Sequence, residues 1–270
     1  MEVEAGWELE GRAAVQQPFL ALIGGEEFSD AFADVHAELL AMLGGGKRRV
    51  AFLPTCAADG GAEAVDYWCA LAQEKLAPLG LSVETPRVVD TASANDADNA
   101  RVVAEADWVY LGGGYPHVGM RVLAGSRVMD ALTESMKRGS LISGASAGAM
   151  LMCARSFVMT PELQVEVSRV WEHGPPPDWN PPLPPPLDCF GWLPRIMCAP
   201  HFNRRLFPYK WIEPFLLPKG FTIVGIDEQT ALVAQPDTGE WHVHGLGAVT
   251  IFGDDLKPAR HEAGEKIALL

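Results

Sequence analysis

Short apolar segments alternate with longer amphipathic segments along the first half of the chain, and this alternation limits the possible folds more than any other feature. The apolar segments have the length and boundaries of buried strands. We predict strands in 19–25, 48–55, 81–89, 107–111 and 141–143. The helices predicted between them are 28–42, 63–79, 96–106 and 126–137. Such an order is typical of an α/β fold, a three-layer α/β/α sandwich with a mostly parallel central sheet.

The second half of the chain has a different pattern. After a proline-rich segment we predict a strand in 195–199, a helix in 204–217 and a strand in 221–227. Three shorter strands follow in 231–235, 241–245 and 248–252, separated by hairpin-type turns, so short antiparallel strands are expected near the C-terminus. Because no repeat and no linker interrupts the chain, we predict a single domain over residues 1–270, with a polar leader in 1–18.

The proline-rich segment, residues 174–186, contains 8 prolines among 13 residues. Proline has no backbone N–H to donate to a sheet, so this segment is predicted to be an extended surface loop. Two interpretations remain open: a plain insertion, or a lid or specificity loop beside the site described below.

Charge and composition exclude several classes of protein. The formal net charge of −14 disfavours nucleic acid and anionic membranes as partners, although it can also serve solubility alone. No apolar run reaches the roughly 18 to 20 residues of a membrane helix, and the acidic start does not resemble a secretory signal. The five cysteines show no CxxC spacing. We therefore expect a cytoplasmic protein with reduced thiols and no bound metal.

The segment Gly144-Ala145-Ser146-Ala147-Gly148 is the strongest local signal for chemistry. It lies between a predicted strand and a helix-favouring run, which is the context of a GxSxG nucleophile elbow. There the serine hydroxyl projects above the sheet beside a helix N-terminus. Ser146 is therefore a candidate nucleophile, and tight packing without catalysis is the alternative.

A second glycine-rich turn, Gly112 to Gly114, directly follows the strand predicted in 107–111. The spacing does not fit a dinucleotide fingerprint. The other glycine run, Gly44-Gly45-Gly46-Lys47, is not a phosphate loop, because Arg48 stands where Ser or Thr is needed. At the carboxyl end of a parallel strand, such glycines can direct backbone N–H groups into the crevice where ligands bind. We predict an oxyanion hole formed by the N–H of Ala147 and that of Gly113 or Gly114, with a simple turn as the alternative.

A serine nucleophile needs a general base and an acid that orients the base. His201 follows the strand predicted in 195–199, so it is expected at the same edge of the sheet as Ser146. Asp227 and Glu228 close the next strand, and only one of these neighbours should reach the histidine. A Ser–acid–His order would instead need Asp188 with His242 or His244. Those two histidines could also bind a metal, but no third ligand is at hand.

Together these motifs resemble the serine peptidase family of dipeptidase E (aspartyl dipeptidase) and cyanophycinase. That family has a class I glutamine-amidotransferase-like fold with serine in place of cysteine. The resemblance covers most of the chain. Its motifs are Gly24-Gly25-Glu26, LGGG at 111–114, GASAGA at 144–149, APHFN at 199–203, VGIDEQTALV at 224–233 and EAGE at 262–265.

The resemblance implies a Ser146–His201–Glu228 triad and a serine peptidase that hydrolyses an amide bond in a dipeptide or short peptide through an acyl-enzyme. It implies no cofactor and a small peptide as the partner, in a monomer or homodimer. Alternatives are a cyanophycinase-like or isoaspartyl-type peptidase, or a non-catalytic amidotransferase-like binding protein.

The chain departs from the family at positions that concern the substrate. Tyr115, followed by Pro116 and His117, stands after LGGG, where dipeptidase E has Asn. The arginines after the histidine are placed in a pattern closer to cyanophycinase, and the proline-rich insertion resembles neither. The substrate-binding candidates are Tyr115, His117, Asn203, Arg204 and Arg205.

Overall fold

The computed structural model describes residues 19–46, 48–156, 185–204, 220–236, 238–253 and 257–269, with isolated positions 162, 165, 169 and 255. The predicted leader, all but the first residue of the helix predicted in 204–217, and most of the proline-rich segment lie outside the described residues.

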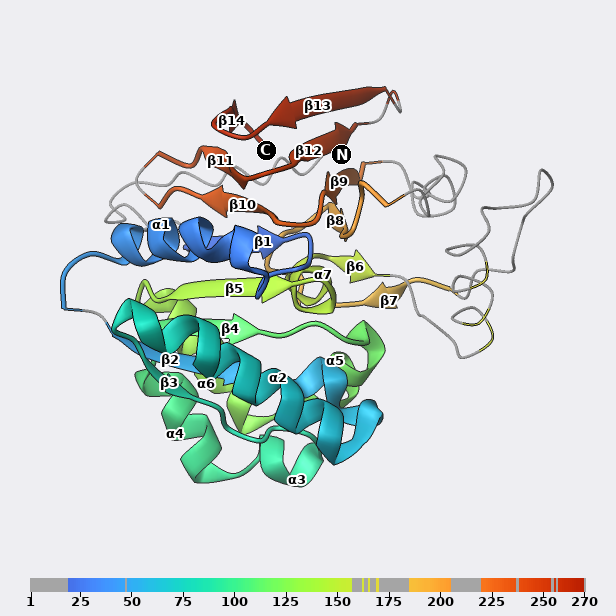
Figure 1. The fold of residues 1–270 in the computed structure, drawn as a ribbon. Coiled ribbons are helices and arrows are strands. Elements are labelled where there is room, and N and C mark those ends of the chain that lie inside the picture. The colour runs from blue at the N-terminus through green and yellow to red at the C-terminus, as the bar shows by residue number, and fades with distance from the viewer. Residues whose placement is uncertain are drawn as a thin grey trace, which may run out of the picture.

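Helices and strands alternate through the first half, as predicted (Figure 1). The helices are α1 (Ala33–Leu43), α2 (Gly61–Leu76), α3 (Thr91–Ala94), α4 (Ala97–Glu105), α5 (Pro116–Leu123), α6 (Arg127–Lys137) and α7 (Ala147–Met152). The strands to this point are β1 (Leu20–Ile23), β2 (Arg49–Leu53), β3 (Ser82–Glu84), β4 (Trp108–Leu111) and β5 (Leu141–Ala145).

Strands dominate the described part of the second half. They are β6 (Arg155–Ser156), β7 (Leu187–Asp188), β8 (Ile196–Ala199), β9 (Thr222–Ile226), β10 (Thr230–Ala234), β11 (Trp241–Gly245), β12 (Ala248–Phe252), β13 (Pro258–Glu262) and β14 (Lys266–Ile267).

The central sheet of the described residues has eight strands in the order β14-β11-β10-β1-β5-β4-β2-β3. The five strands from β1 to β3 in this order are parallel, and β10, β11 and β14 extend the sheet with antiparallel pairing. The predicted α/β class is therefore confirmed, including the antiparallel strands near the C-terminus.

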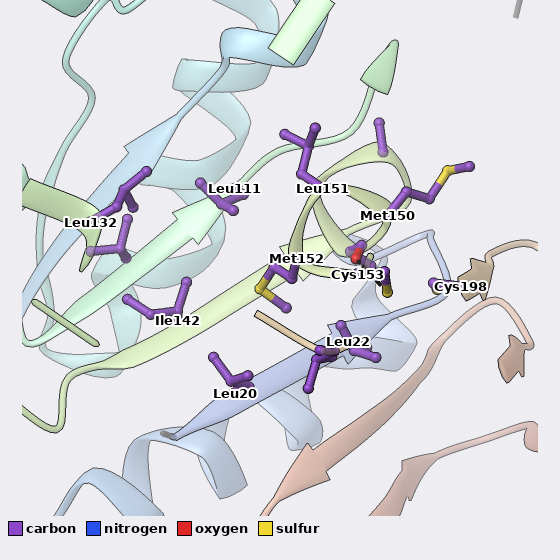
Figure 2. Packing of buried hydrophobic residues seen from close by; sticks show 14 of the residues in the cluster. Leu20, Leu22, Leu111, Leu132, Ile142, Met150, Leu151, Met152, Cys153 and Cys198 are labelled. Carbon is purple, nitrogen blue, oxygen red and sulfur yellow. Dashed lines mark hydrogen bonds between the residues drawn. The ribbon is translucent and has the colours of Figure 1, made fainter. Parts of the chain in front are cut away.

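Side chains of the central strands alternate between two apolar clusters, as expected for a sheet buried on both faces. Leu20 and Leu22 face a cluster that includes α4, α5, α6 and α7, part of which Figure 2 shows. Ala21 and Ile23 face the other cluster, which includes α1 and α2. These two helix layers hold the parallel strands, and hence the loops at their carboxyl ends, in place.

The structure differs from the expectation that all site loops belong to one sheet. β8 and β9 pair with each other in a separate four-stranded sheet of order β13-β12-β9-β8. The neighbouring position beside β1 is occupied by β10, because the chain reverses after β9 and β10 runs back antiparallel along β1. The loops after β8 and β9 still reach the loop after β1, as the hydrogen bonds below show.

Two element boundaries were predicted too long for identifiable reasons. The strand predicted in 81–89 is only Ser82–Glu84, because Pro86 lacks the N–H that continued pairing requires. The helix predicted in 63–79 ends at Leu76 and continues as a short 3-10 turn over Ala77–Leu79, which contains Pro78. Within the described residues, no helix is long and apolar enough to cross a membrane.

A buried histidine on α1 makes the stability of the fold depend on pH. His36 is 2% exposed and lies among the rings of Phe28, Phe32, Trp108 and Tyr110. Burial lowers the pKa of His36 from 6.5 to about 3, because the apolar surroundings disfavour the charged imidazolium. The unfolded chain therefore binds a proton on this group at a higher pH than the folded protein does.

We expect the free energy of unfolding to fall as the pH is lowered from about 6.5 toward 3, the interval in which only the unfolded state holds this proton. Over two pH units the contribution is about 2 to 3 kcal/mol. Urea unfolding of the wild type and of His36→Phe at neutral pH and near pH 4.5 measures it. The variant should lose less stability than the wild type, and equal losses would contradict a neutral buried His36.

Candidate active site

Ser146 occupies the sharp turn between β5 and α7, as the GxSxG pattern predicts. Its backbone angles, φ 50° and ψ −112°, are strained for a residue with a side chain. The flanking glycines are required by close approach: a Cβ on Gly144 would lie 2.4 Å from the carbonyl carbon of Gly148, and one on Gly148 would lie 2.2 Å from the oxygen of Leu111. Larger residues at these two positions would push the helix away from the strand and move the serine.

His201 lies in the loop after β8, also with a positive φ, of 53°. Its imidazole ring lies against Gly25, in the loop after β1. A Cβ at Gly25, where φ is +131°, would lie 2.2 Å from His201 Cε1. Only glycine at position 25 therefore leaves room for the ring in this orientation.

Glu228 lies in the turn between β9 and β10, where its backbone is tied to the loop after β8 and to the start of β10. Its N–H donates to Asn203 Oδ1 at 3.0 Å, and its carbonyl accepts from Thr230 Oγ1 at 3.1 Å. Asn203, predicted to bind substrate, thus holds the loop that carries the acid.

Three consecutive carbonyls at the end of β1 accept hydrogen bonds from the three site loops. The pairs are Ser146 N–H to Ile23 O at 2.9 Å, His201 N–H to Gly24 O at 2.8 Å, and Gln229 N–H to Gly25 O at 2.8 Å. These bonds bring together loops that belong to different sheets.

The side chains of Ser146, His201 and Glu228 form a continuous line. Ser146 Oγ lies 3.1 Å from His201 Nε2, and His201 Nδ1 lies 2.6 Å from Glu228 Oε1. Arg204 Nε also pairs with Glu228 Oε1. A carboxylate that accepts the Nδ1 proton leaves Nε2 as an acceptor for the serine hydroxyl proton, so the arrangement can generate a serine nucleophile.

The neighbouring acid Asp227 has a different environment. Its Oδ2 accepts from the N–H of Ala248 at 3.0 Å and lies 3.4 Å from Arg260, in the second sheet. Of the two adjacent acids, Glu228 alone contacts His201 in the described structure, as the alternation of strand residues predicts. Asp188, the acid of the alternative Ser–acid–His order, instead pairs with Arg155, and His244 pairs with Glu38.

Gly113 and Gly114 lie across from Ser146 in the loop after β4. A Cβ at Gly113 would lie 3.5 Å from Ser146 Cβ. None of the other described residues accepts a hydrogen bond from the N–H of Gly113, Gly114 or Ala147. These three amides are therefore available to an oxygen atom bound beside the serine.

A pocket of about 640 Å³ opens beside Ser146 and His201. One wall is the loop after β1, from Glu26 to Asp30, and the other is α2, with Tyr67, Trp68, Leu71 and Lys75. The volume suits a small ligand and its apolar walls can bury one.

The predicted substrate-binding residues are only partly brought to this pocket. Arg204 lines it, whereas Tyr115 and His117 are not among its lining residues. Their rings instead lie near each other in a tilted arrangement, with centroids 5.7 Å apart. Arg205 lies outside the described residues.

The pocket also contains residues that the sequence reasoning missed. Glu27 and the aromatic pair Tyr67 and Trp68 were not predicted. The sequence did carry a signal for α2, because Tyr67 is an aromatic residue outside the apolar face of an amphipathic helix, and the structure leaves it 60% exposed. Among the described residues, no group of three His, Cys, Asp or Glu side chains could hold a metal ion.

Known peptidases are similar to this chain in sequence and in fold. The model of peptidase family S51 matches residues 20–241, which include Ser146, His201 and Glu228. A peptidase from an acI-B1 Actinobacterium has a similar structure, with 25% identity, a TM-score of 0.77 and coverage of 94% of this chain and 97% of that one. A putative peptidase E protein from Listeria monocytogenes EGD-e shares the fold, with 16% identity, a TM-score of 0.56 and coverage of 85% and 99%. No curated protein matches the chain.

Proposed function

Since the chain belongs to peptidase family S51 and is a serine-type peptidase, we propose that it hydrolyses one amide bond of a dipeptide or short peptide through an acyl-enzyme on Ser146. His201 is the proposed general base and Glu228 the acid that orients it. The single observation that carries the proposal is the continuous hydrogen-bonded line from Ser146 Oγ through both ring nitrogens of His201 to Glu228 Oε1.

In the first half of the proposed reaction, His201 Nε2 takes the proton of Ser146 Oγ as the oxygen attacks the carbonyl carbon. The negative charge that develops on the carbonyl oxygen is stabilised by the N–H groups of Ala147 and of Gly113 or Gly114. Collapse of the tetrahedral intermediate breaks the amide bond, and His201 gives its proton to the leaving amine.

In the second half, water replaces the amine. His201 removes a proton from the water as it attacks the ester, and returns that proton to Ser146 Oγ when the acid product leaves. Glu228 holds the Nδ1 proton throughout and stabilises the imidazolium. All steps use groups of the chain itself.

The size of the pocket supports a short substrate. A volume of about 640 Å³ accommodates a dipeptide or a small peptide end rather than a folded chain. The residues of its walls bear both charges and aromatic rings, which suits a zwitterionic peptide with an apolar side chain.

A panel of dipeptides and isoaspartyl dipeptides, with release of free amino acids as the readout, tests the proposal. Cleavage of ordinary dipeptides supports dipeptidase activity, whereas cleavage confined to isoaspartyl substrates would favour the isoaspartyl alternative. Ser146→Ala serves as the blank. If no panel member is cleaved faster than by this blank, the proposed hydrolysis is wrong.

Gly25→Ala tests the placement of the base. The added methyl group would occupy the space of the His201 ring, so the ring must move away from Ser146. A misplacement of about 1 Å can cost on the order of 10²-fold in rate, and we expect a loss of that size in kcat. Gly45→Ala, at a position with open space around its Cβ, is the matched control. Equal activity of the two variants would contradict the proposed position of the base.

A further inference from the structure

A second carboxylate lies in the pocket, and the mechanism above does not use it. Glu27 follows Gly25 and Glu26 in the loop after β1, lines the pocket, and is only 4% exposed. Its Oε1 is buried without a hydrogen-bond partner among the described residues. The carboxylate does accept a hydrogen bond from its own backbone N–H. Burial of a carboxylate oxygen without a hydrogen-bond partner destabilises the folded protein. The presence of such an oxygen in a binding pocket therefore points to a ligand group that donates the missing hydrogen bond.

The free oxygen of Glu27 lies beside the proposed nucleophile. A Cβ at Gly113 would lie 3.9 Å from Glu27 Oε1 and 3.5 Å from Ser146 Cβ. Ser146 and Glu27 Oε1 therefore both lie next to Gly113. A ligand that is bound at Ser146 and packs against Gly113 therefore lies near Glu27, in the pocket that all three residues line.

The other charged residues of the pocket have partners already. Lys75 pairs with Asp30 at 2.8 Å, and Arg204 pairs with Glu26 at 3.3 Å and with Glu228. Glu27 thus adds a negative charge that no described side chain balances. Burial, together with the nearby charge of Glu26, raises the pKa of Glu27 from 4.5 to about 7, so this carboxyl group gains most from a cation.

Another described neighbour of Glu27 gives no cation either. Tyr110, on β4, is close enough to interact electrostatically with it, and the pKa of this buried phenol is raised well above 10. Both groups are neutral or negative near neutral pH.

We propose that Glu27 binds the free α-ammonium group of the substrate and thereby selects peptides with an unblocked amino end. The proposal rests on the proposed function, since it concerns the acyl half of the same substrate. The α-nitrogen is two bonds from the carbonyl carbon that Ser146 attacks, and this short separation fits the position of both Glu27 and Ser146 next to Gly113. A charge-assisted hydrogen bond in a buried pocket is then the basis of the selection.

The test compares three forms of each cleaved dipeptide: amino-free, N-acetylated, and des-amino, in which hydrogen replaces the amino group. The des-amino form is smaller than the natural substrate, so poor cleavage of it cannot be due to a steric clash. At about pH 7.5 most α-amino groups, whose pKa is about 8, are protonated. We expect kcat/KM of the wild type to be about 10- to 100-fold higher for the amino-free than for the des-amino form.

Glu27→Gln separates charge from shape. The amide keeps the size of the side chain and can still donate a hydrogen bond, but it carries no charge. In this variant the ratio of kcat/KM for the amino-free form to that for the des-amino form should fall to about one, and most of the change should be in KM. The control is Glu240→Gln, at a surface carboxylate that pairs with Lys266, and it should keep the wild-type ratio.

Three results would overturn the proposal. Equal cleavage of amino-free and des-amino forms by the wild type would do so without any variant, and therefore even if Glu27→Gln fails to fold. An unchanged ratio in folded Glu27→Gln would do so as well. The third result is faster cleavage of substrates that carry a carboxylate in place of the ammonium group than of amino-free substrates. If Glu27→Gln keeps this preference, Glu27 acts as a neutral hydrogen-bond donor. If des-amino substrates are cleaved in a Ser146-dependent way, the proposed function stands whichever of these results is found.

Discussion

Ser146→Ala is expected to lower kcat/KM for any cleaved dipeptide by at least about 10⁴-fold. The variant keeps the pocket and the amides of the proposed oxyanion hole but has no oxygen to form the acyl-enzyme. Binding should persist, so the loss falls on kcat rather than on KM. Steady-state kinetics with release of free amino acids, and a burst experiment that follows acyl-enzyme formation, measure the effect.

The fold should survive this change. The serine hydroxyl bonds only to His201 among the described side chains, and the backbone N–H that anchors the turn is unaffected. Thermal melting should therefore remain within a few degrees of the wild type. Ser82→Ala, on the edge strand β3, is the matched control and should keep full activity. Retention of more than a few per cent of wild-type kcat by Ser146→Ala would refute the nucleophile.

Glu228→Gln is expected to lower kcat by about 10³- to 10⁴-fold. Glutamine has the same shape, but its amide can present an NH₂ group to Nδ1 of His201 and stabilise the tautomer whose Nε2 carries the proton. In that tautomer the ring cannot accept the serine proton. Loss of the carboxylate also removes the charge that stabilises the imidazolium.

Asp227→Asn is the matched variant, one residue earlier in the chain. Asp227 binds the second sheet through Ala248 and Arg260, so the substitution should reduce stability by about 1 to 3 kcal/mol while kcat changes less than 10-fold. Comparison of kcat with the midpoint of urea unfolding for both variants separates the two roles. Similar losses of kcat in both would contradict the assignment of Glu228 as the orienting acid.

The parallel half of the fold was predictable because the spacing of apolar residues within each segment indicates whether it forms a strand or a helix. Strands such as Leu20–Ile23 are short apolar runs buried on both faces, and helices such as α6 show apolar residues at three- and four-residue spacing. The predicted family and fold class are accordingly confirmed. The glycines around Ser146 were readable for the same reason, since a sharp strand-to-helix turn restricts its own sequence.

What the sequence did not predict depends on contacts between distant segments. β13 was missed because its residues are mostly exposed and show no apolar alternation. The separation of β8 and β9 into a second sheet depends on which strand pairs with β1, and local pattern does not determine that. The short helix α5 was missed too, although Pro116 at its first turn was a usable signal.

Glu27 illustrates the same limit at the site. Glu26 and Glu27 are chemically identical neighbours, yet the first lies at the surface and the second is buried. The difference arises from the turn at Glu26, whose φ is 56°, and from the packing of the loop against other elements. Neither the turn nor this packing can be predicted from the local sequence.

The three peptide carbonyls of Ile23, Gly24 and Gly25 have a consequence for how this enzyme can diverge. Because they set the spacing of serine, histidine and acid, the stretches of chain between those residues need not have any particular length, and 55 positions separate Ser146 from His201. Insertions can therefore be accommodated in this interval, and the proline-rich segment 174–186 lies within it. Adding one residue between Ile23 and Gly25, by contrast, would shift these carbonyls relative to one another and so misalign the side chains that they hold in line.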